Sequence, residues 1–396
     1  MTGRDYLKIW YRVQIGATLI ILMMMMMIRN FELGRNIWLQ LLWMVIILGI
    51  GLSEELWENV PSIISRVNCW LQGLAQPIIL TFAWGVITRE IITVLHMPSR
   101  GVVSIMILYY FVMYAPFASV IGGQMELSIE RFIFVIWMFQ IVIVPFTSLP
   151  FDLIDNQKLS TLLATGAVGA VAYFIFATTV MRAWHLSWPG LKPNWSGDFN
   201  WWILLLMIAI FVVPLGGNMM AINHLPKGGF FKLTCQAFEA GLAEESLFRF
   251  AMLGVLFYAW RNVKQRLPLA LLTSSILFGF AHLINLGGQR ADLTFYQIGV
   301  AFLLGLFLAV VYVYTGQLWL TMLMHFSLDW FSFLATGTTK LTGDLVPGDW
   351  WALLILFVIF GGFSVWMMFG TRRKVMERHV KRLTGEHQHF GYSIQY

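Results

Sequence analysis

Six side chains in the second half of the sequence have the types and spacing that hydrolytic chemistry requires. They lie in apolar stretches, where a charge costs at least about 2.5–3.5 kcal/mol to insert, so each is a candidate functional residue. They form three short motifs, and the residues are Glu244, Glu245, Arg249, His282, His325 and Asp329. If the motifs converge, these carboxylates, imidazoles and guanidinium can activate a water molecule and stabilise an oxyanion.

The first motif, Glu-Glu-Ser-Leu-Phe-Arg, spans residues 244–249. Glu245 and Arg249 are four residues apart, so on a helix they share a face and can form an ion pair through the guanidinium fork. Glu244 lies about 100° around the helix from that pair. Adjacent carboxylates make each other harder to ionise, so Arg249 would keep Glu245 charged and leave Glu244 as the adjustable general base. The alternative is a purely structural ion pair.

The other two motifs each place a histidine on an apolar helix. His282 follows Gly279 and Ala281, whose small side chains allow another helix to approach closely. Taken alone, His282 could equally be a capped residue at a helix end. His325 and Asp329 are four residues apart and share a face, and a histidine at membrane depth needs such a partner. A structural His–Asp pair is the alternative for this motif.

The composition determines which elements must position these residues. The chain has 396 residues, of which 26 are Lys or Arg and 20 are Asp or Glu, and this 12% is about half the charged fraction of a soluble domain. Hydrophobic residues make up 59%. These values exclude a soluble globular enzyme, a disordered chain, a fibrous protein and an outer-membrane barrel. Only helices and closed barrels satisfy their backbone in hydrocarbon, so the sequence predicts an all-α, polytopic transmembrane helical bundle.

About 20 apolar residues cross a bilayer core, and the chain contains about twelve such stretches, with a range of about 10–14. The predicted spans are 9–28, 37–53, 70–95, 102–122, 132–150, 160–182, 201–220, 236–260, 268–285, 296–315, 317–335 and 350–370. Arg4, Lys8 and Arg12 precede an apolar run that ends at Ile28, and no cleavage pattern follows this run, so we expect a signal anchor.

The spans group into four regions. Residues 1–183 form an N-terminal membrane bundle of about six spans, with no motif that indicates its function. Residues 184–200 form a loop rich in Trp and Pro. Residues 201–370 form a second bundle of about six spans, which carries all three motifs. Residues 371–396 form a basic tail.

Basic residues predict the orientation in the membrane. The loop 261–267 contains Arg261, Lys264 and Arg266, and the segment 372–386 contains six basic and two acidic residues. Four predicted spans separate these segments, so both lie on one side, which the positive-inside rule makes cytoplasmic. Both termini are then cytoplasmic in an integral protein of the plasma membrane, and Glu244 lies in the outer half of its span. We expect the tail to contact anionic lipid and not nucleic acid.

In order, the motifs Glu-Glu-x-x-x-Arg, Phe-x-x-x-His and His-x-x-x-Asn or Asp on three apolar helices resemble the CAAX protease and bacteriocin-processing (CPBP/Abi) family. The third motif ends here in Asp329, and the second begins with Phe278. The family consists of intramembrane endopeptidases and includes the CAAX prenyl (Ras-converting) proteases. The resemblance covers residues from about 230 to 335 and leaves the N-terminal bundle outside it.

The resemblance implies a role for each residue of the first two motifs. Glu244 would activate the hydrolytic water, and His282 would help to orient or deprotonate it. Glu245 and Arg249 would orient the site, with the arginine fixing the carboxylate geometry. Phe278 would pack the site without taking part in the chemistry.

In the third motif the sequence departs from the family. By resemblance, His325 and the residue at position 329 would stabilise the oxyanion, and the family often has Asn where this chain has Asp329. An ionised carboxylate cannot donate a hydrogen bond to an oxyanion. Asp329 is therefore either protonated, or it serves only to orient His325.

The same side chains include possible zinc ligands. A catalytic zinc ion usually has three protein ligands, and Glu244, His282 and His325 could supply them. The sequence lacks the His-Glu-x-x-His spacing that places two histidines on one metal ion. We therefore expect a glutamate-type mechanism without a cofactor, and zinc is the alternative.

The predicted function is that of an intramembrane endopeptidase. Its substrate would be a peptide or protein at the bilayer, such as a bacteriocin or pheromone precursor or a lipidated protein. The alternative from the same family is a non-catalytic protein for bacteriocin self-immunity or membrane signalling. A transporter also suits two halves of about six spans, but the two halves show no matching pairs of broken helices, and Arg89 and Glu90 are expected to reach the interface or to pair locally. The oligomeric state stays open.

Overall fold

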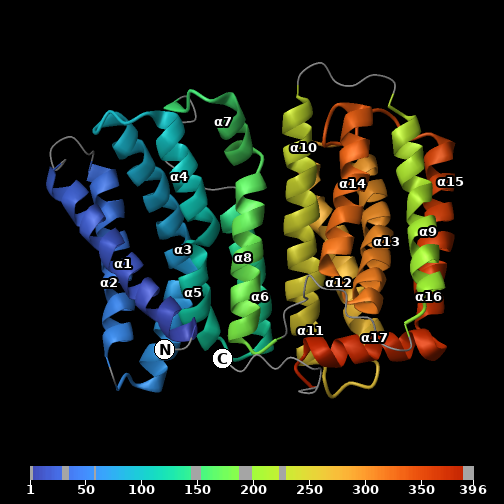
Figure 1. The fold of residues 1–396 in the computed structure, drawn as a ribbon, viewed down its shortest axis with the longest axis horizontal. Coiled ribbons are helices and arrows are strands. Elements are labelled where there is room, and N and C mark those ends of the chain that lie inside the picture. The colour runs from blue at the N-terminus through green and yellow to red at the C-terminus, as the bar shows by residue number, and fades with distance from the viewer. Residues whose placement is uncertain are drawn as a thin grey trace. The chain divides into compact units, whose positions relative to one another are not determined.

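The structure is a computed structural model, and it describes all residues except 1–2, 29–34, 58, 144–152, 187–198, 223–228 and 387–396. The described residues form helices and short connections, with no β-strand among them, which confirms the predicted all-α fold. The chain divides into two compact units, one formed by Met1–Trp184 and one that begins at His185 (Figure 1).

The first unit is coloured blue to green in Figure 1. Its helices are α1 (Gly3–Ile28), α2 (Arg35–Leu56), α3 (Ser62–Thr93), α4 (Ser99–Val112), α5 (Tyr114–Val120), η1 (Gly122–Gln124), α6 (Ser128–Ile143), α7 (Gln157–Ala164) and α8 (Ala167–Ala183). Helix α8 packs against α4, α5 and α6. Its side chains Ala170, Tyr173 and Phe176 are fully buried, so the core of this unit lies along α8.

Two glycines shape the start of α8. Gly166 has φ of 79°, a left-handed conformation that suits glycine, and it allows α7 and α8 to meet at an angle of 50°. A Cβ atom on Gly169 would lie 2.3 Å from the carbonyl oxygen of Val142, so only glycine permits the close contact between α6 and α8. The packing of this unit therefore depends on backbone approach as well as on apolar burial.

Charged residues of the first unit are neutralised in local pairs. Arg66 pairs with Glu130, whose side chain is 7% exposed. The predicted pairing of Arg89 with Glu90 is confirmed, with Nη2 and Oε1 3.0 Å apart. Each of these carboxylates lies against a cation, which offsets the cost of placing charge among apolar helices.

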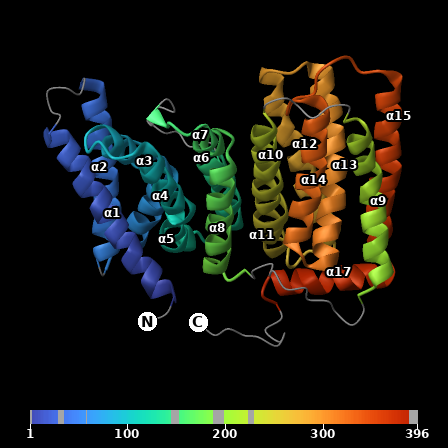
Figure 2. The same cartoon turned by 45° about the horizontal axis from the view of Figure 1, so that its top comes forward.

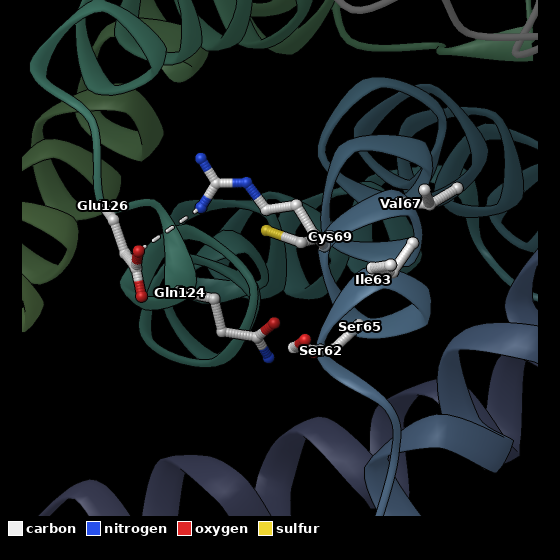
Figure 3. Close-up of a pocket in the computed structure, with 8 residues that line it drawn as sticks. Ser62, Ile63, Ser65, Val67, Cys69, Gln124 and Glu126 are labelled. Carbon is white, nitrogen blue, oxygen red and sulfur yellow. Dashed lines mark ion pairs between the residues drawn. The ribbon is translucent and has the colours of Figure 1, made fainter.

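A pocket of about 640 Å³ lies beside the first turns of α3 (Figure 3). It is lined by Ser62, Ile63, Ser65, Arg66, Val67, Cys69, Gln124 and Glu126. The Nη1 atom of Arg66 is 3.7 Å from Oε2 of Glu126, the pair joined by the dashed line in Figure 3. The lining contains no histidine, and its arginine is paired with its glutamate, so this pocket lacks the imidazoles of the second and third motifs.

The second unit is coloured yellow-green to red in Figure 1. Its elements are α9 (Trp201–Met220), α10 (Phe230–Glu239), η3 (Ala240–Glu244), η4 (Ser246–Met252), α11 (Leu253–Ala259), α12 (Arg266–Ala281), η5 (His282–Gly287), α13 (Ala291–Thr315), α14 (Leu318–Thr336), α15 (Pro347–Leu356), η6 (Phe357–Gly361), α16 (Gly362–Met367) and α17 (Gly370–Leu383). Helix α13 is the most buried of the long apolar helices and packs against α12, α14, α15 and α17. Helix α14 packs against α9, α10 and η3.

The basic segment that was expected to be a tail begins with a packed helix. Figure 2 shows α17 crossing the ends of the neighbouring helices of this unit. Its apolar side chains Val375, Met376 and Val380 are fully buried, and Nδ1 of His379 donates to the carbonyl oxygen of Val313 at 2.8 Å. The predicted division between the bundle and the tail at residue 370 therefore falls inside one packed unit, because α17 packs against the bundle.

The two basic segments used to predict the orientation meet at this end of the second unit. Arg266, which follows the loop after α11, lies 2.5 Å from Glu386, and Arg373 of α17 donates to Gln265 at 3.4 Å. The loop and the basic segment therefore lie on the same side of the second unit, as the span count predicted.

Nine helices in the described part of the chain are long and apolar enough to cross a membrane, and α7 with α8 makes a tenth if the pair is one span. Each predicted span corresponds to one helix or to consecutive helices, which in the span 160–182 meet at a bend of 50°, and residues 144–150 lie outside the described residues. Of the other predicted spans, α6 has only 16 residues, and the run 230–259 contains the charges of the first motif. The chain is an integral membrane protein.

Candidate active site

The first motif lies on a continuous helical run, 230–259, that begins with α10 and ends with α11. Between these helices, η3 and η4 are π-helical turns, whose hydrogen bonds join residues i and i+5. Residues five apart therefore line up, whereas an α-helix would place them about 140° apart. The helix that carries the first motif therefore departs from α-helical geometry at Ala240–Glu244 and at Ser246–Met252.

A fully buried set of three side chains forms the base of the site. Glu245, Arg249 and His325 have exposed side-chain fractions of 0%, 1% and 4%. Nε of Arg249 lies 3.2 Å from Oε2 of Glu245, and Nδ1 of His325 donates to Oε1 of Glu245 at 2.9 Å. Glu245 thus has a basic partner on each oxygen, and the predicted ion pair is present.

Arg249 does not make the expected bidentate contact with Glu245. Its two Nη atoms have no hydrogen-bond partner among the described residues. Instead the guanidinium carbon lies 4.2 Å from the ring centroid of Phe278, a cation–π distance. The Phe278 ring also makes edge contacts with the rings of His282 and His325, at 5.4 and 5.7 Å between centroids. Phe278 therefore packs beneath both histidines.

Two carboxylates lie beside this base and are more exposed. The side chains of Glu244 and Asp329 are 25% and 24% exposed. Nε2 of His325 lies 3.9 Å from Oε2 of Glu244 and 3.5 Å from Oδ2 of Asp329. His325 therefore connects the buried carboxylate at one ring nitrogen with the two partly exposed carboxylates at the other.

His282 completes the cluster from the end of α12. Its Nδ1 atom donates to the carbonyl oxygen of Phe278 at 3.0 Å, which fixes the tautomer of the neutral ring and leaves a lone pair on Nε2. The ring lies close enough to Glu244 for an electrostatic interaction with that carboxyl group. The structure thus brings together all six side chains that the three motifs predicted.

Close helix contacts hold the motifs in register. A Cβ atom on Gly241 would lie 2.8 Å from the backbone nitrogen of Phe326 and 2.9 Å from the carbonyl oxygen of Met322. On the other side, a Cβ atom on Gly279 would lie 3.0 Å from the carbonyl oxygen of Ile298, so the predicted close approach at this glycine is confirmed. Small residues on η3 and α12 therefore let α14 and α13 approach the site.

Glu239 also belongs to this cluster, although no motif predicted it. It ends α10, is partly buried, and its charge interacts with those of Glu244, Asp329 and His325. It precedes Glu244 by five residues, so α-helical spacing would have placed the two on different faces. The signal in the sequence was a carboxylate inside an otherwise apolar run, which by itself marks a functional candidate.

The alternative zinc ligands, Glu244, His282 and His325, all belong to this cluster. The Nδ1 atoms of His282 and His325 donate to Phe278 and Glu245, so only the Nε2 atoms could bind a metal ion, and Nε2 of His325 is 3.9 Å from Glu244. In the part of the chain that the structure describes, no group of three or more His, Cys, Asp or Glu side chains could hold a metal ion.

The sequence that forms this site matches a known protein family. The family model of the type II CAAX prenyl endopeptidases, Rce1-like, matches residues 226–331, which include all three motifs. This segment is Rce1-like. The family resemblance seen in the motifs is thereby confirmed for the Rce1-like segment, and the match supports intramembrane protease activity. No curated protein and no solved structure matches the chain.

Proposed function

We propose that the chain is an intramembrane endopeptidase in which Glu244 activates the attacking water. The observation that supports this most directly is the position of Glu244. Its carboxylate is partly exposed and lies 3.9 Å from Nε2 of His325, beside a base of fully buried charges. One water molecule can contact both groups at this separation. Glu244 takes a proton from that water as the oxygen attacks the substrate carbonyl carbon.

His282 orients the same water in this proposal. Its Nδ1–H is held by the Phe278 carbonyl, so the lone pair on Nε2 is free to accept a hydrogen bond. A histidine fixed in this tautomer cannot turn away from the site without breaking that bond. The role assigned to His282 by resemblance is compatible with this geometry.

His325 stabilises the oxyanion. Carboxylates lie at both ring nitrogens, 2.9 Å away at Nδ1 and 3.5 Å away at Nε2, and together they favour the protonated ring. Its Nε2–H can then donate to the oxyanion, a contact worth about 10²–10³-fold in rate. Asp329 orients His325, which accounts for an aspartate where the family often has asparagine.

The proposed substrate is a lipidated protein cleaved near its C-terminus. This choice rests on the Rce1-like match of residues 226–331, since that family is named for CAAX prenyl endopeptidases. Cleavage of a bacteriocin or pheromone precursor is the alternative substrate class. The chemistry at Glu244 is the same for both.

Cleavage of a defined peptide tests the proposal. The probe is a farnesylated peptide ending in Cys-Val-Ile-Met, incubated with the full chain in phosphatidylcholine vesicles. The native chain should release the last three residues, and Glu244→Gln should not. Glu377→Gln, a partly exposed glutamate of α17 paired with Arg373, is the matched control and should cleave normally.

Two further arms decide between the alternatives. If the probe is not cleaved, mass spectrometry of host membranes containing native chain or Glu244→Gln should reveal an uncleaved protein that accumulates only with the variant. No difference between these membranes would overturn the protease proposal. A protective or signalling effect that survives Glu244→Gln would favour the non-catalytic alternative.

A metal requirement is tested on the same reaction. We propose that the peptidase works without a resident metal ion, so cleavage should persist in the presence of EDTA or 1,10-phenanthroline. Loss of cleavage with chelator and its recovery with zinc would overturn this part of the proposal.

We also propose that α17 faces the cytoplasm. The loop 261–265 and α17 meet at one end of the second unit and carry basic residues. Cysteine substitutions at Lys264 and Lys374 should therefore resist membrane-impermeant maleimide added outside intact cells. Labelling of these positions from outside would reverse the orientation.

A further inference from the structure

Glu239 is a carboxyl group without a cation of its own. It makes no hydrogen bond or ion pair with a described residue, and its charge interacts with Glu244, Asp329 and His325. Its side chain is partly buried at the end of α10. It therefore lies beside the proposed active site and has no structural partner that would explain its presence.

Two contacts with α14, one from α10 and one from η3, fix the position of Glu239 along α14. Nearer the start of α10, Nε1 of Trp330 donates to Oγ1 of Thr234 at 3.0 Å. Farther along the run, Gly241 lies directly against the backbone of Phe326. Glu239 lies between these contacts, and the opposing stretch of α14 contains Asp329. The π-helical turn η3 then aligns Glu239 with Glu244.

The distribution of charge distinguishes Glu239 from the other carboxyl groups. Glu245 is held by Arg249 and His325, and Glu244 and Asp329 share the Nε2 atom of His325. A carboxyl group near other carboxylates, among apolar helices and without a cation, is favoured in its neutral form. Glu239 is thus suited to hold a proton while Glu244 accepts one.

We propose that Glu239 is the general acid of the reaction, and this inference rests on the proposed peptidase function. When the carbon–nitrogen bond of the tetrahedral intermediate breaks, its electron pair moves to nitrogen, and Glu239 donates the proton that the leaving amine requires. Glu244 holds the proton taken from water. That proton passes to Glu239 after the amine leaves, which restores both carboxyl groups for the next cycle.

The competing mechanism uses Glu244 for both proton transfers. In that case Glu244 takes the proton from water and returns it to the leaving nitrogen, and Glu239 has no part in bond cleavage. The two mechanisms differ in what happens when the leaving group needs no proton. A thiol has an ordinary pKa of about 8.5, so a thiolate leaves without protonation.

The test compares two farnesylated probes that differ at the scissile bond, one an amide and one a thioester, with uncatalysed thioester hydrolysis subtracted. Glu239→Gln should lower kcat on the amide by about 10²–10³-fold and change kcat on the thioester by less than about threefold. Glu244→Gln should lower both. Retained thioester cleavage also shows that the Glu239 variant is folded.

Three results would overturn the inference. Equal loss on both probes would assign Glu239 a structural or positioning role, and no loss on either would return both proton transfers to Glu244. If the native chain cleaves neither probe and the membrane comparison with Glu244→Gln reveals no substrate, the peptidase proposal itself fails. Glu239→Asp should recover part of the activity on the amide, because aspartate has a carboxyl group that can donate a proton, but its side chain is one methylene shorter.

Discussion

The two units of this chain place the same charged residue types among apolar helices and arrange them differently. In the first unit Arg66 pairs with Glu130, and Glu55 is flanked by Lys8 and Arg12 at 3.1 Å. The second unit instead gathers several carboxyl groups around one arginine and two histidines. Charge that is neutralised locally supports the fold, whereas charge that is shared leaves proton acceptors free to react.

The helices differ between the units in a related way. Among the described residues, π-helical turns occur only in the second unit, at η3, η4 and η6; η3 carries Glu244, η4 carries Arg249, and Glu245 lies between these two turns. Such turns are rare and are frequent at functional sites. In the first unit, the pocket beside α3 is lined by an ion-paired arginine and by residues of α3, of η1 and of the segment after η1, and none of them lies in a π-helical turn (Figure 3). The π-helical turns and the shared charges thus occur together in the second unit.

The largest effect that separates the units is expected for Glu244→Gln compared with Glu130→Gln. Removing the general base should lower kcat by about 10³-fold or more while the protein still inserts. Glu130 is equally carboxylic and more buried, but it is paired with Arg66, so Glu130→Gln should leave kcat unchanged. Cleavage of the farnesylated amide probe measures both. Equal loss in the two variants would remove the distinction between the units.

Arg249→Met should be the most destabilising of the changes to ion pairs. Removing one partner of a fully buried pair leaves Glu245 with less compensation, at a cost of about 3–5 kcal/mol in the free energy of unfolding. Arg89→Met removes a partly exposed local pair and should cost about 0–1 kcal/mol. Denaturant unfolding in detergent gives both values. Similar costs would mean that burial of the pair does not matter here.

Gly241→Ala and Gly169→Ala make the same change at two close backbone contacts, one in each unit. Both should destabilise by about 1–3 kcal/mol, because the added methyl group meets a backbone carbonyl. Only Gly241→Ala should also reduce kcat, by about tenfold or more, since it moves η3 against α14 and misplaces Glu244. Thermal unfolding and cleavage, measured on the same preparations, separate the two effects. A matching fall in kcat for Gly169→Ala would contradict this.

Asp329→Asn should have a smaller effect on catalysis. Asparagine can still hold His325 through its side-chain oxygen, so kcat should stay within about tenfold of the native value. Asp329→Leu removes that contact and should lower kcat by about 10²-fold or more. If asparagine proves as damaging as leucine, the charge of Asp329 has a direct part in the reaction.

The smallest effect is expected for the pair Arg266 and Glu386, which is neutralised in the manner of the first unit. Partial burial acts to raise the pKa of Glu386, but hydrogen bonds from Arg266 and Thr384 outweigh it and lower that pKa. The stabilisation is therefore present above the usual glutamate pKa and is lost as pH falls through the lowered value. Arg266→Met should cost at most about 1 kcal/mol at pH 7, with the difference from native vanishing at low pH and kcat unaffected.

Much of the fold and part of the site could be predicted from the sequence. The helices were predictable because a chain in hydrocarbon must satisfy its backbone within each segment, whatever its neighbours are. The pairs Glu245–Arg249 and His325–Asp329 followed from four-residue spacing, and both are present. Glu239 was missed because its alignment with Glu244 depends on a π-helical turn, and nothing in a single sequence indicates where such a turn forms.

The sequence by itself determined that this is an all-α membrane protein with three polar motifs in one half, because scarce charges in apolar segments are informative wherever they stand. Only the tertiary structure decided that His325 joins Glu245 to Glu244 and Asp329, that Arg249 lies over Phe278 and not in a fork on Glu245, and that α17 packs against α13. The physical reason is the distance along the chain over which the interactions act. Hydrophobicity and helical spacing act along the chain, whereas these contacts depend on how closely separate helices approach at residues such as Gly241.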